Sequence, residues 1–375
     1  MDTLKDDVRV NDSAVRRTVE IGGVIALLLA GACETFEPEG SLDVAEAGLG
    51  DDRVAAVARS VSAHGRRCPV VTRLAEFGTD DFVTGSTIGP DGALYVTDGR
   101  AGEVLRIDRR DGRVSTYATG FPPKAFQEGS IGGPVDVAFM GRTAYVLVSL
   151  VSGEYFGEPF GDPQAKNGLY RIEPDGTHTL VADLGQWSID NPPQPAFFIN
   201  TGLQFAMEPY WGGFLVTDGH HNRVLWVGRH GSIHELATFG NVVPTGIEVT
   251  AGHVFVTQLG PIPHHPEDGK VFTLGAGREP HEVASGASML IDVERGPRGK
   301  LYGLSQGQWD GVEEGSRAEP NTGRLVVVGR HGDLTPVMDC DGQELVLDRP
   351  VSVEFVGNTA YVVSVTGVVY RVNDL

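Results

Sequence analysis

The chain has 375 residues, with 50 Asp or Glu against 30 Lys or Arg, which gives a formal net charge of −20. That charge repels nucleic-acid phosphates and anionic lipid headgroups, so it argues against nucleic acid as a partner. The 51 glycines and 22 prolines are typical of a turn-rich all-β chain, and 41% hydrophobic residues are enough for the core of a domain of some 300 residues.

Residues 1–33 resemble an export signal. Arg16 and Arg17 precede a twelve-residue apolar segment, IGGVIALLLAGA, which is too short for a stable membrane anchor. Cys33 follows at once, so we keep two outcomes, a cleaved signal peptide or a lipoprotein with its lipid anchor at Cys33. Glu20 weakens both, and a cytosolic helix is the alternative. We expect an extracytoplasmic protein that is secreted, periplasmic or lipid-anchored.

Residues 34–67 are acidic at first and then rich in Ala, Val and Arg. The stretch VAAVARSVSA favours a short helix. We interpret 34–67 as a linker, and 68–375 as the folded domain.

The first clear elements of that domain lie in IGPDGALYVTDGRAGEVLRIDRRDG, from Ile88 to Gly112. Turn residues separate short apolar runs, which predicts strands at 94–97, 104–107 and 114–118. The pattern is that of a β-meander.

The same pattern occurs six times with a period near fifty residues. Its second strands are centred at Tyr95-Val96, Tyr145-Val146, Leu215-Val216, Phe255-Val256, Tyr302-Gly303 and Tyr361-Val362. Such a repeat is typical of a propeller, in which each sheet buries both faces against its neighbours. We predict an all-β fold, a monomeric six-bladed β-propeller.

Closure of the ring is predicted from its first and last strands. Val70 to Phe77 has no partner in the first meander, and the sixth meander stops at Leu375 after its third strand. The N-terminal strand would complete the last blade and remove an open sheet edge.

From about residue 68 the chain resembles the ScyD/ScyE family of NHL-like propellers. The resemblance rests on GPDGALYVTD at 89, VDVAFMGRTAYV at 135, LVADLGQW at 180, FLVTDGHHNRVLWV at 214, VPTGIEVTAGHVFVTQL at 243 and IDVERGPRGKLYGLSQ at 291. It implies an extracytoplasmic propeller whose biochemical activity is mostly undefined.

Propeller topology places the longest loops on one face, which we call the long-loop face. They are residues 150–167, 259–269 and 307–323 within blades and 121–133 and 185–200 between blades. Long loops gathered on a rigid scaffold are a common binding surface. Their aromatic residues are candidates to hold a small molecule, a glycan or a protein, unless they pack on each other: Tyr155, Phe156, Phe160, Trp187, Phe197, Phe198 and Trp309.

The first strand of each blade should line the central channel. Aligning the copies gives one column of six residues: Gly85, Asp136, Gly202, Gly246, Asp292 and Ser352. Asp136 and Asp292 face each other across the ring, so they are candidates to hold a divalent cation. The favoured alternative is that they fix backbone amides of neighbouring blades.

A second candidate metal site combines two loops of adjacent blades. Imidazole and carboxylate side chains suit zinc and other transition metals. The candidate ligands are Asp218, His220, His221, His264 and His265, although paired histidines in loops more often only add polarity. We interpret His230 and His331, in twin GRHG turns on the opposite face, as turn residues.

Sequence motifs give an enzyme little support, because no Gly-x-Ser-x-Gly elbow occurs on a strand-to-helix turn and His-Glu-x-x-His is absent. We expect Cys68 and Cys340 to lie on opposite faces, beyond the reach of a disulfide. The favoured function is therefore an exported binding or scaffold protein, and no cofactor is assigned. The alternative is a metal-assisted hydrolase or lactonase that uses a channel cation.

Overall fold

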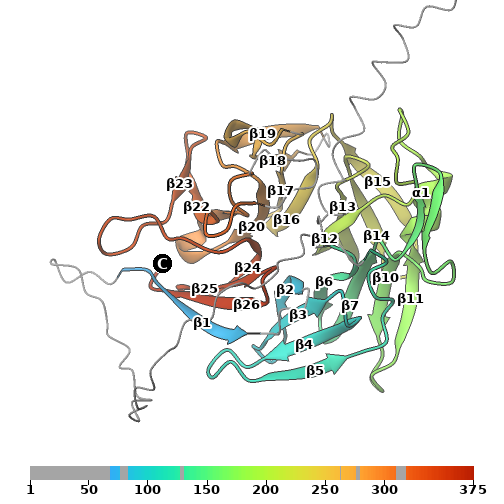
Figure 1. The fold of residues 1–375 in the computed structure, drawn as a ribbon, viewed down its shortest axis with the longest axis horizontal. Coiled ribbons are helices and arrows are strands. Elements are labelled where there is room, and N and C mark those ends of the chain that lie inside the picture. The colour runs from blue at the N-terminus through green and yellow to red at the C-terminus, as the bar shows by residue number, and fades with distance from the viewer. Residues whose placement is uncertain (1–67, 77–82, 127–130, 262, 276–278, 310–317) are drawn as a thin grey trace, which may run out of the picture.

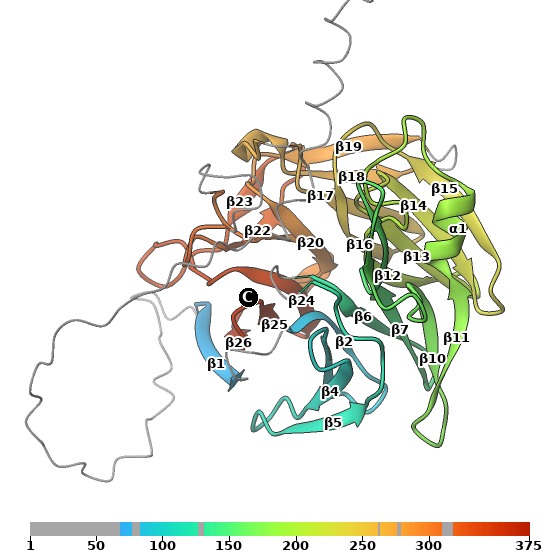
Figure 2. The same ribbon diagram turned by 45° about the vertical axis from the view of Figure 1, so that its right-hand side comes forward.

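The structure is a computed structural model that describes residues 68–76, 83–126, 131–261, 263–275, 279–309 and 318–375. Figures 1 and 2 show six sheets arranged as a ring around a central channel. The predicted signal and linker, residues 1–67, lie outside the described residues. The predicted six-bladed all-β fold is confirmed.

Each blade is a four-stranded antiparallel sheet whose first strand lies innermost. Blade 1 contains β2 (Val83–Ile88), β3 (Leu94–Asp98), β4 (Glu103–Ile107) and β5 (Val114–Ala118); blade 2 contains β6 (Gly133–Met140), β7 (Thr143–Ser149), β10 (Gly168–Ile172) and β11 (His178–Asp183); and blade 3 contains β12 (Gln204–Tyr210), β13 (Gly213–Asp218), β14 (Arg223–Gly228) and β15 (Ile233–Thr238).

Blade 4 contains β16 (Pro244–Thr250), β17 (His253–Gln258), β18 (Lys270–Leu274) and β19 (Pro280–Ser285); blade 5 contains β20 (Leu290–Arg295), β21 (Leu301–Ser305), β22 (Arg324–Val328) and β23 (Leu334–Pro336); and blade 6 contains β24 (Pro350–Val356), β25 (Thr359–Ser364), β26 (Val368–Asn373) and β1 (Val70–Glu76).

Three kinds of element lie outside the four-stranded sheets. The hairpin of β8 (Ser152–Tyr155) and β9 (Glu158–Gly161) rises from blade 2, and short turns of 3-10 helix lie at η2 (Pro266–Asp268) and η3 (Pro297–Gly299). Helix α1 (Leu184–Asp190) connects blades 2 and 3, and the Asp183 side chain caps its first turn. No helix among the described residues is long and apolar enough to cross a membrane.

The core lies between the blades because the second and third strands of the sheets carry apolar residues on both faces. In β3, for example, all five residues are buried, and Leu94 and Val96 are fully inaccessible. Each sheet therefore packs on two neighbours and depends on both.

A ring of side-chain hydrogen bonds near the channel joins each blade to the next. The donors and acceptors, in blade order, are Thr84 Oγ1 to Val135 O (3.1 Å), Met207 N to Asp136 Oδ2 (2.7 Å), Thr217 Oγ1 to Thr245 O (2.6 Å), Thr245 Oγ1 to Leu290 O (3.0 Å), Val353 N to Asp292 Oδ2 (2.8 Å), and the hydroxyls of Ser352 and Ser86 (2.8 Å). These bonds fix the positions of the inner strands and thereby the shape of the channel.

Strand β1 closes the ring as the sequence predicts. It pairs antiparallel with β26, from Val70 opposite Asn373 to Glu76 opposite Val368. The last blade thus combines the first and the last strand of the domain, and no edge of β26 stays open (Figure 1).

The expectation for the two cysteines is wrong, because Cys68 and Cys340 form a disulfide with a Cα–Cα distance of 5.1 Å. The outer strand of blade 5, β23, ends after three residues. The chain then folds back in a turn at residues 339–343. In this turn the Asp339 N–H donates to the Gln343 carbonyl, and Met338 and Glu344 form an isolated antiparallel β-bridge. This turn brings Cys340 to the start of β1.

Truncation tests the closure. Removing residues 1–66 should leave a folded ring, whereas removing residues 1–78 deletes β1 and exposes the edge of β26. Each lost backbone hydrogen bond costs ~1 kcal/mol of a typical total of ~5–15 kcal/mol, so the longer deletion should melt far lower or aggregate. Thermal melting and size-exclusion chromatography measure this.

Cys340→Ser serves as the control, because it keeps β1 and removes only the disulfide. Its expected loss is smaller, typically about 2–4 kcal/mol. Equal melting of the two truncations would contradict closure by β1.

Candidate functional site

The register of the strands corrects the predicted channel column in blade 3. In each blade, the residue directly after the column residue on the first strand lies opposite the centre of the second strand. Ser86 lies opposite Val96 in this way, and Met207 lies opposite Val216. Ala206, not Gly202, therefore occupies the column in blade 3. The other five positions follow the predicted alignment.

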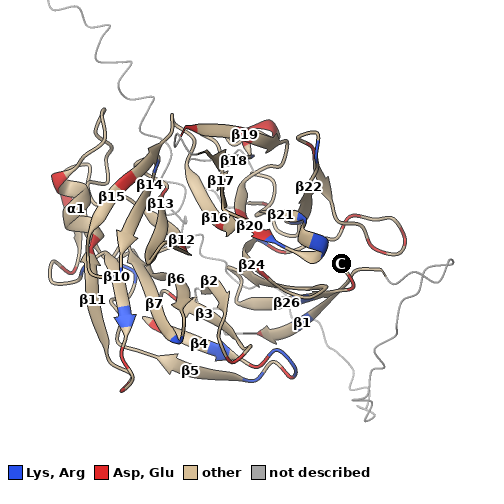
Figure 3. Cartoon of the chain, turned by 180° about the vertical axis from the view of Figure 1, so that it is seen from behind, with Lys and Arg blue, Asp and Glu red and all other residues tan. Residues whose placement is uncertain are grey.

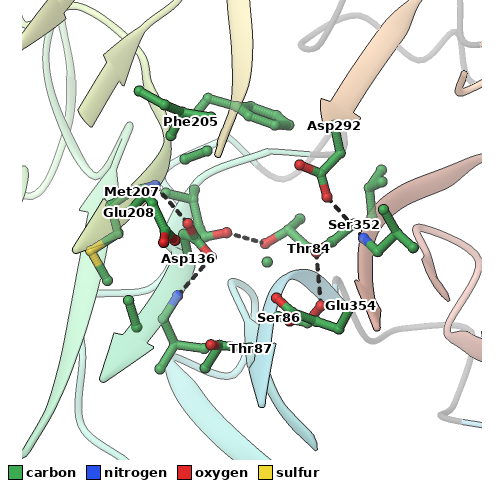
Figure 4. A pocket seen from close by; sticks show the side chains of 18 of the residues that line it. Thr84, Ser86, Thr87, Asp136, Phe205, Met207, Glu208, Asp292, Ser352 and Glu354 are labelled. Carbon is green, nitrogen blue, oxygen red and sulfur yellow. Dashed lines mark hydrogen bonds between the residues drawn. The ribbon is translucent and has the colours of Figure 1, made fainter. Parts of the chain in front are cut away.

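Asp136 and Asp292 hold backbone amides of the neighbouring blade. Asp136 accepts hydrogen bonds from the N–H groups of Val137 and Met207, and Asp292 accepts from those of Val293 and Val353. Figure 4 shows the two carboxylates on different sides of the channel, each bonded in this way.

A glycine precedes each of these aspartates in the ring. A Cβ atom at Gly85 would collide with Asp136, and one at Gly246 would collide with Asp292. The glycines of blades 1 and 4 therefore make room for the aspartates of blades 2 and 5. This pairing explains why glycine and aspartate alternate in part of the column.

Sequence reasoning missed a second column of acidic residues. Side chains alternate along a strand, so residues two positions beyond the first column face the same channel. Four of the six are glutamates, one in each of blades 3 to 6: Glu208, Glu248, Glu294 and Glu354. The signal was available in the sequence, because the four glutamates recur at one fixed offset from the column.

The channel is narrow where these carboxylates meet. Its cavity of about 50 Å³ is lined by both aspartates and by Glu208, Glu294 and Glu354, together with Thr84, Ser86 and Ser352. In Figure 4 the labelled carboxylates of Asp136, Glu208, Asp292 and Glu354 surround one small space. Several acidic groups thus share a poorly solvated volume.

Burial raises the pKa of each of these acids, and mutual repulsion adds to the effect. The pKa of Asp292 rises to about 7 and that of Asp136 lies well above its ordinary value, although backbone N–H groups stabilise the charged forms. Burial and the neighbouring carboxylates also place the pKa values of Glu208, Glu294 and Glu354 well above the usual range. The channel therefore retains protons near neutral pH or attracts cations in their place.

The predicted channel cation site stays a prediction. Carboxylate oxygens are ligands that hard cations prefer, and the second column adds glutamates to the two aspartates. Among the described residues, however, no three His, Cys, Asp or Glu side chains converge as ligands of one metal ion.

The predicted site at Asp218, His220 and His221 is buried and its groups are bonded to the protein. Asp218 accepts from the backbone N–H of Leu203 at 3.0 Å and from Arg223 Nε at 3.1 Å. Burial alone would raise the pKa of Asp218, but its interactions with His221 and with the Arg223 guanidinium lower it below the ordinary value. Asp218 is thus the buried anion of an ion-pair network.

Both histidines of this network bind the same backbone segment. Ile199 donates its N–H to His220 Nε2, and its carbonyl lies 2.9 Å from His221 Nε2. Burial lowers the pKa of His220 to about 3, so that this ring is neutral at physiological pH. The pair orders the connection between blades 2 and 3.

His264 and His265 lie on the loop of the next blade. His264 is buried, and its Nδ1 lies 2.9 Å from the carbonyl of Gly260. His265 caps η2: its carbonyl accepts from the Asp268 N–H at 2.9 Å, and its own N–H donates to Asp268 Oδ2 at 3.3 Å. No contact among the described residues joins these two histidines to Asp218, His220 or His221.

Three of the seven predicted aromatic residues form one cluster. Phe156 stacks on Phe198 with ring centroids 4.5 Å apart and an interplanar angle of 7°, and Tyr155 meets both rings edge-on. The hairpin that carries them is tied down by Phe156 N to Phe198 O and by Asn200 N to Glu154 O. Packing among these rings is real, but Phe156 stays 63% exposed.

The other predicted aromatic residues lie outside this cluster of three rings, although Phe126 links Phe160 to Tyr155, and Phe197 packs edge-on against His220. Phe160 packs on Phe126, and the guanidinium of Arg223 lies over the ring of Trp187. The ring of Trp309, in the loop of blade 5, meets the ring of His264, in the loop of blade 4, edge-on. The long-loop face thus presents one compact aromatic platform, Tyr155, Phe156 and Phe198, instead of a continuous patch.

Comparisons with known proteins support the fold. A scan of protein-family models and a search of curated proteins found no match. Among solved structures, the chain is similar to virginiamycin B lyase from Staphylococcus aureus, with 11% identity, a TM-score of 0.51, and coverage of 81% of this chain and 99% of that one.

Two further solved structures are similar to a comparable degree. They are a gluconolactonase from Xanthomonas campestris (14% identity, TM-score 0.50, 85% of this chain and 92% of that one) and a PQQ-bound aldose sugar dehydrogenase from Streptomyces coelicolor (12%, 0.50, 81% and 98%). The neighbours are six-bladed propellers. At these identities the likeness shows the fold and carries no activity.

The channel acids predict an unusual pH dependence. Between the ordinary glutamate pKa of about 4.3 and the raised value in the fold, the folded protein binds more protons than the unfolded chain, so its stability falls as pH rises. Glu354→Gln removes one such charge and should raise the melting temperature at pH 8, with a smaller gain at pH 4.5. Melting curves from pH 4.5 to 8 measure this.

Glu158→Gln is the matched control, because it removes the same charge from the exposed strand β9. It should leave the pH profile unchanged. The assignment fails if Glu354→Gln shifts the melting temperature equally at both pH values or destabilises the protein at pH 8.

Proposed function

We propose that this protein is an exported binding or scaffold propeller that engages its ligand through the long-loop face. The observation that carries the proposal is the platform of Tyr155, Phe156 and Phe198. An exposed aromatic ring held rigid by a stacked neighbour buries a large area on binding and loses little conformational entropy. The ligand class stays open between a small molecule, a glycan and a protein, as the aromatic surface suits each.

Substitution of Phe156 tests the proposal. Phe156 occupies a left-handed turn position with φ of 51°, followed by Gly157 with φ of 83°, where asparagine is favoured. Phe156→Asn should therefore keep or raise the melting temperature while it removes the exposed ring. We expect at least a tenfold loss in partner capture from native extracts, which corresponds to about 1.4 kcal/mol.

Trp211→Asn provides a control on the opposite face. Trp211 is 86% exposed and has φ of 46° before Gly212, so its turn is of the same kind. This variant should capture partners as the unmodified protein does. Unchanged capture by Phe156→Asn, or an equal loss in both variants, would exclude the long-loop face as the binding surface.

The proposal places the protein in an extracytoplasmic compartment. The disulfide of Cys68 and Cys340 supports this, because disulfides persist mainly in oxidising compartments. The export signal in residues 1–33 supports it independently. The resemblance to the ScyD/ScyE family, whose members are likewise propellers, agrees with the same location but carries no activity.

The second candidate function is a metal-assisted hydrolase or lactonase with a cation in the channel. Three of the glutamates missed in the sequence favour it, because Glu208, Glu294 and Glu354 line the channel together with Asp136 and Asp292. The long-loop proposal needs no such ion.

Mass spectrometry of the protein isolated from its native host separates these possibilities. The denatured mass should correspond to a chain that begins near Cys33 and contains one disulfide. Native mass and elemental analysis should show no stoichiometric metal if binding is the whole function. An unprocessed, reduced chain would contradict export, and one bound calcium, zinc or manganese ion per chain would favour the hydrolase.

A further inference from the structure

A cleft on the face opposite the long loops concentrates positive charge. It has a volume of about 560 Å³ and lies mainly between blades 2 and 3. Its lining includes three arginines, a histidine and two tyrosines: Arg142, Arg171, Arg229, His230, Tyr117 and Tyr145. Figure 3 shows a basic segment at the end of β10, on a molecule whose loops carry many acidic residues. The positive charge of this cleft is opposite in sign to the net charge of the chain, which is −20.

Two of the arginines have no counter-charge. Arg171 is bound by Glu173, with its Nη2 and Nε donating at 2.7 and 3.0 Å to the same carboxylate oxygen. Arg142 and Arg229 are exposed and make no ion pair or hydrogen bond with any residue that the structure describes. Glu173 is the acidic residue among those that line the cleft, so the charge of two guanidiniums is left over.

Tyr145 adds a neutral hydrogen-bonding group to the cleft. Its side chain is only 5% exposed, and its ring packs on Phe214 with centroids 4.8 Å apart. Its strand position is directly opposite Arg171. The hydroxyl lines the cleft yet makes no hydrogen bond among the described residues. Tyr145 is thus held in place by its packing, and its hydroxyl can donate a hydrogen bond to a ligand oxygen in the cleft.

The twin turn in blade 5 shows that the free charge in blade 3 is particular to this cleft. Both turns read Gly-Arg-His-Gly, and in both the first glycine donates its N–H to the residue after the turn at 2.8 Å. That residue is Ser232 in blade 3 but Asp333 in blade 5. Blade 5 therefore carries its own carboxylate in the same turn as the arginine and histidine, whereas blade 3 has a neutral serine at this position.

We propose that this cleft binds a small organic oxyanion, a carboxylate or a phosphate ester, through Arg142, Arg229 and the Tyr145 hydroxyl. Guanidinium groups pair with both oxyanions in bidentate geometry, and a hydroxyl can donate a further hydrogen bond. The volume lies within the 300–1,000 Å³ that small-molecule sites usually occupy. The site is independent of the long-loop face, so either proposal can fail without the other.

Isothermal titration with three probes tests the site at constant ionic strength. The probes are citrate, glycerol 3-phosphate and glycerol as the uncharged control. We expect one or both anions to bind with a stoichiometry of one, and glycerol not to bind. Binding of citrate alone identifies a carboxylate site, and binding of glycerol 3-phosphate alone identifies a phosphate-ester site.

Variants assign the binding to the cleft. Arg142→Gln with Arg229→Gln should weaken binding by about tenfold or more, because a hydrogen bond to a charged group contributes about 1.5–3 kcal/mol. Tyr145→Phe should weaken it by about two- to tenfold, as expected for a neutral hydrogen bond. Arg330→Gln, the matched change in the twin turn of blade 5, should have no effect. Melting temperatures confirm that each variant is folded.

Two outcomes would overturn the proposal. One is that neither anion binds. The other is that Arg330→Gln weakens binding as much as Arg229→Gln does, because the anions would then respond to general surface charge.

Discussion

The pairing of β1 with β26 is the interaction on which the other features of this molecule depend. A propeller blade is stabilised by both of its neighbours, so a ring that opens at one place loses packing on two blades at once. Here the last blade obtains its outer strand from the start of the domain, and Val71 of that strand packs in the same core cluster as Val372. The disulfide joins Cys68, two residues before this strand, to Cys340 of the neighbouring blade.

Once the ring is closed, the inner strands converge and their polar groups must be satisfied within the protein. Threonine, serine and aspartate side chains meet this demand by bonding to the next blade, and glycines at 85 and 246 make room for two of them. The glutamates two positions further along the strands form the second column, in which Glu248 shares a hydrogen bond with Glu294 of the next blade. Burial and mutual repulsion raise the pKa values of Glu208 and Glu354, so ionising these acids inside the fold costs stability.

Much of this architecture could be predicted from the sequence, because each blade repeats the same turns and strand centres. The closing strand could be predicted because the first meander has one strand too many and the sixth has one too few. The disulfide did not, since the prediction assumed that the outer strand of blade 5 continues to one face, and β23 instead stops after three residues. The residues around Cys340 contain no pattern from which we predicted the turn that brings Cys340 to Cys68.

The site was predicted in part, for reasons that differ from residue to residue. Asp136 and Asp292 were found because they stand at the strand centres, whereas Glu208 was hidden by an error of four residues in the alignment of blade 3. The sequence predicted His220 and His221 as metal ligands in a loop, but both side chains are buried by hydrogen bonds, His220 with Ile199 and His221 with Ile199 and Arg223. The cleft of Arg142 and Arg229 joins turns of two blades, and only the three-dimensional structure brings them together.

Amide hydrogen exchange, followed by mass spectrometry with the disulfide intact and then reduced and capped, tests the central role of ring closure most directly. Closure by β1 predicts that β1 and β26 exchange as slowly as β25 in the oxidised protein. After reduction, protection should fall first in β1 and β26, before it falls in β13 and β14 on the far side of the ring. Fast exchange of β1 in the oxidised protein, or an equal loss of protection in all blades after reduction, would contradict the account.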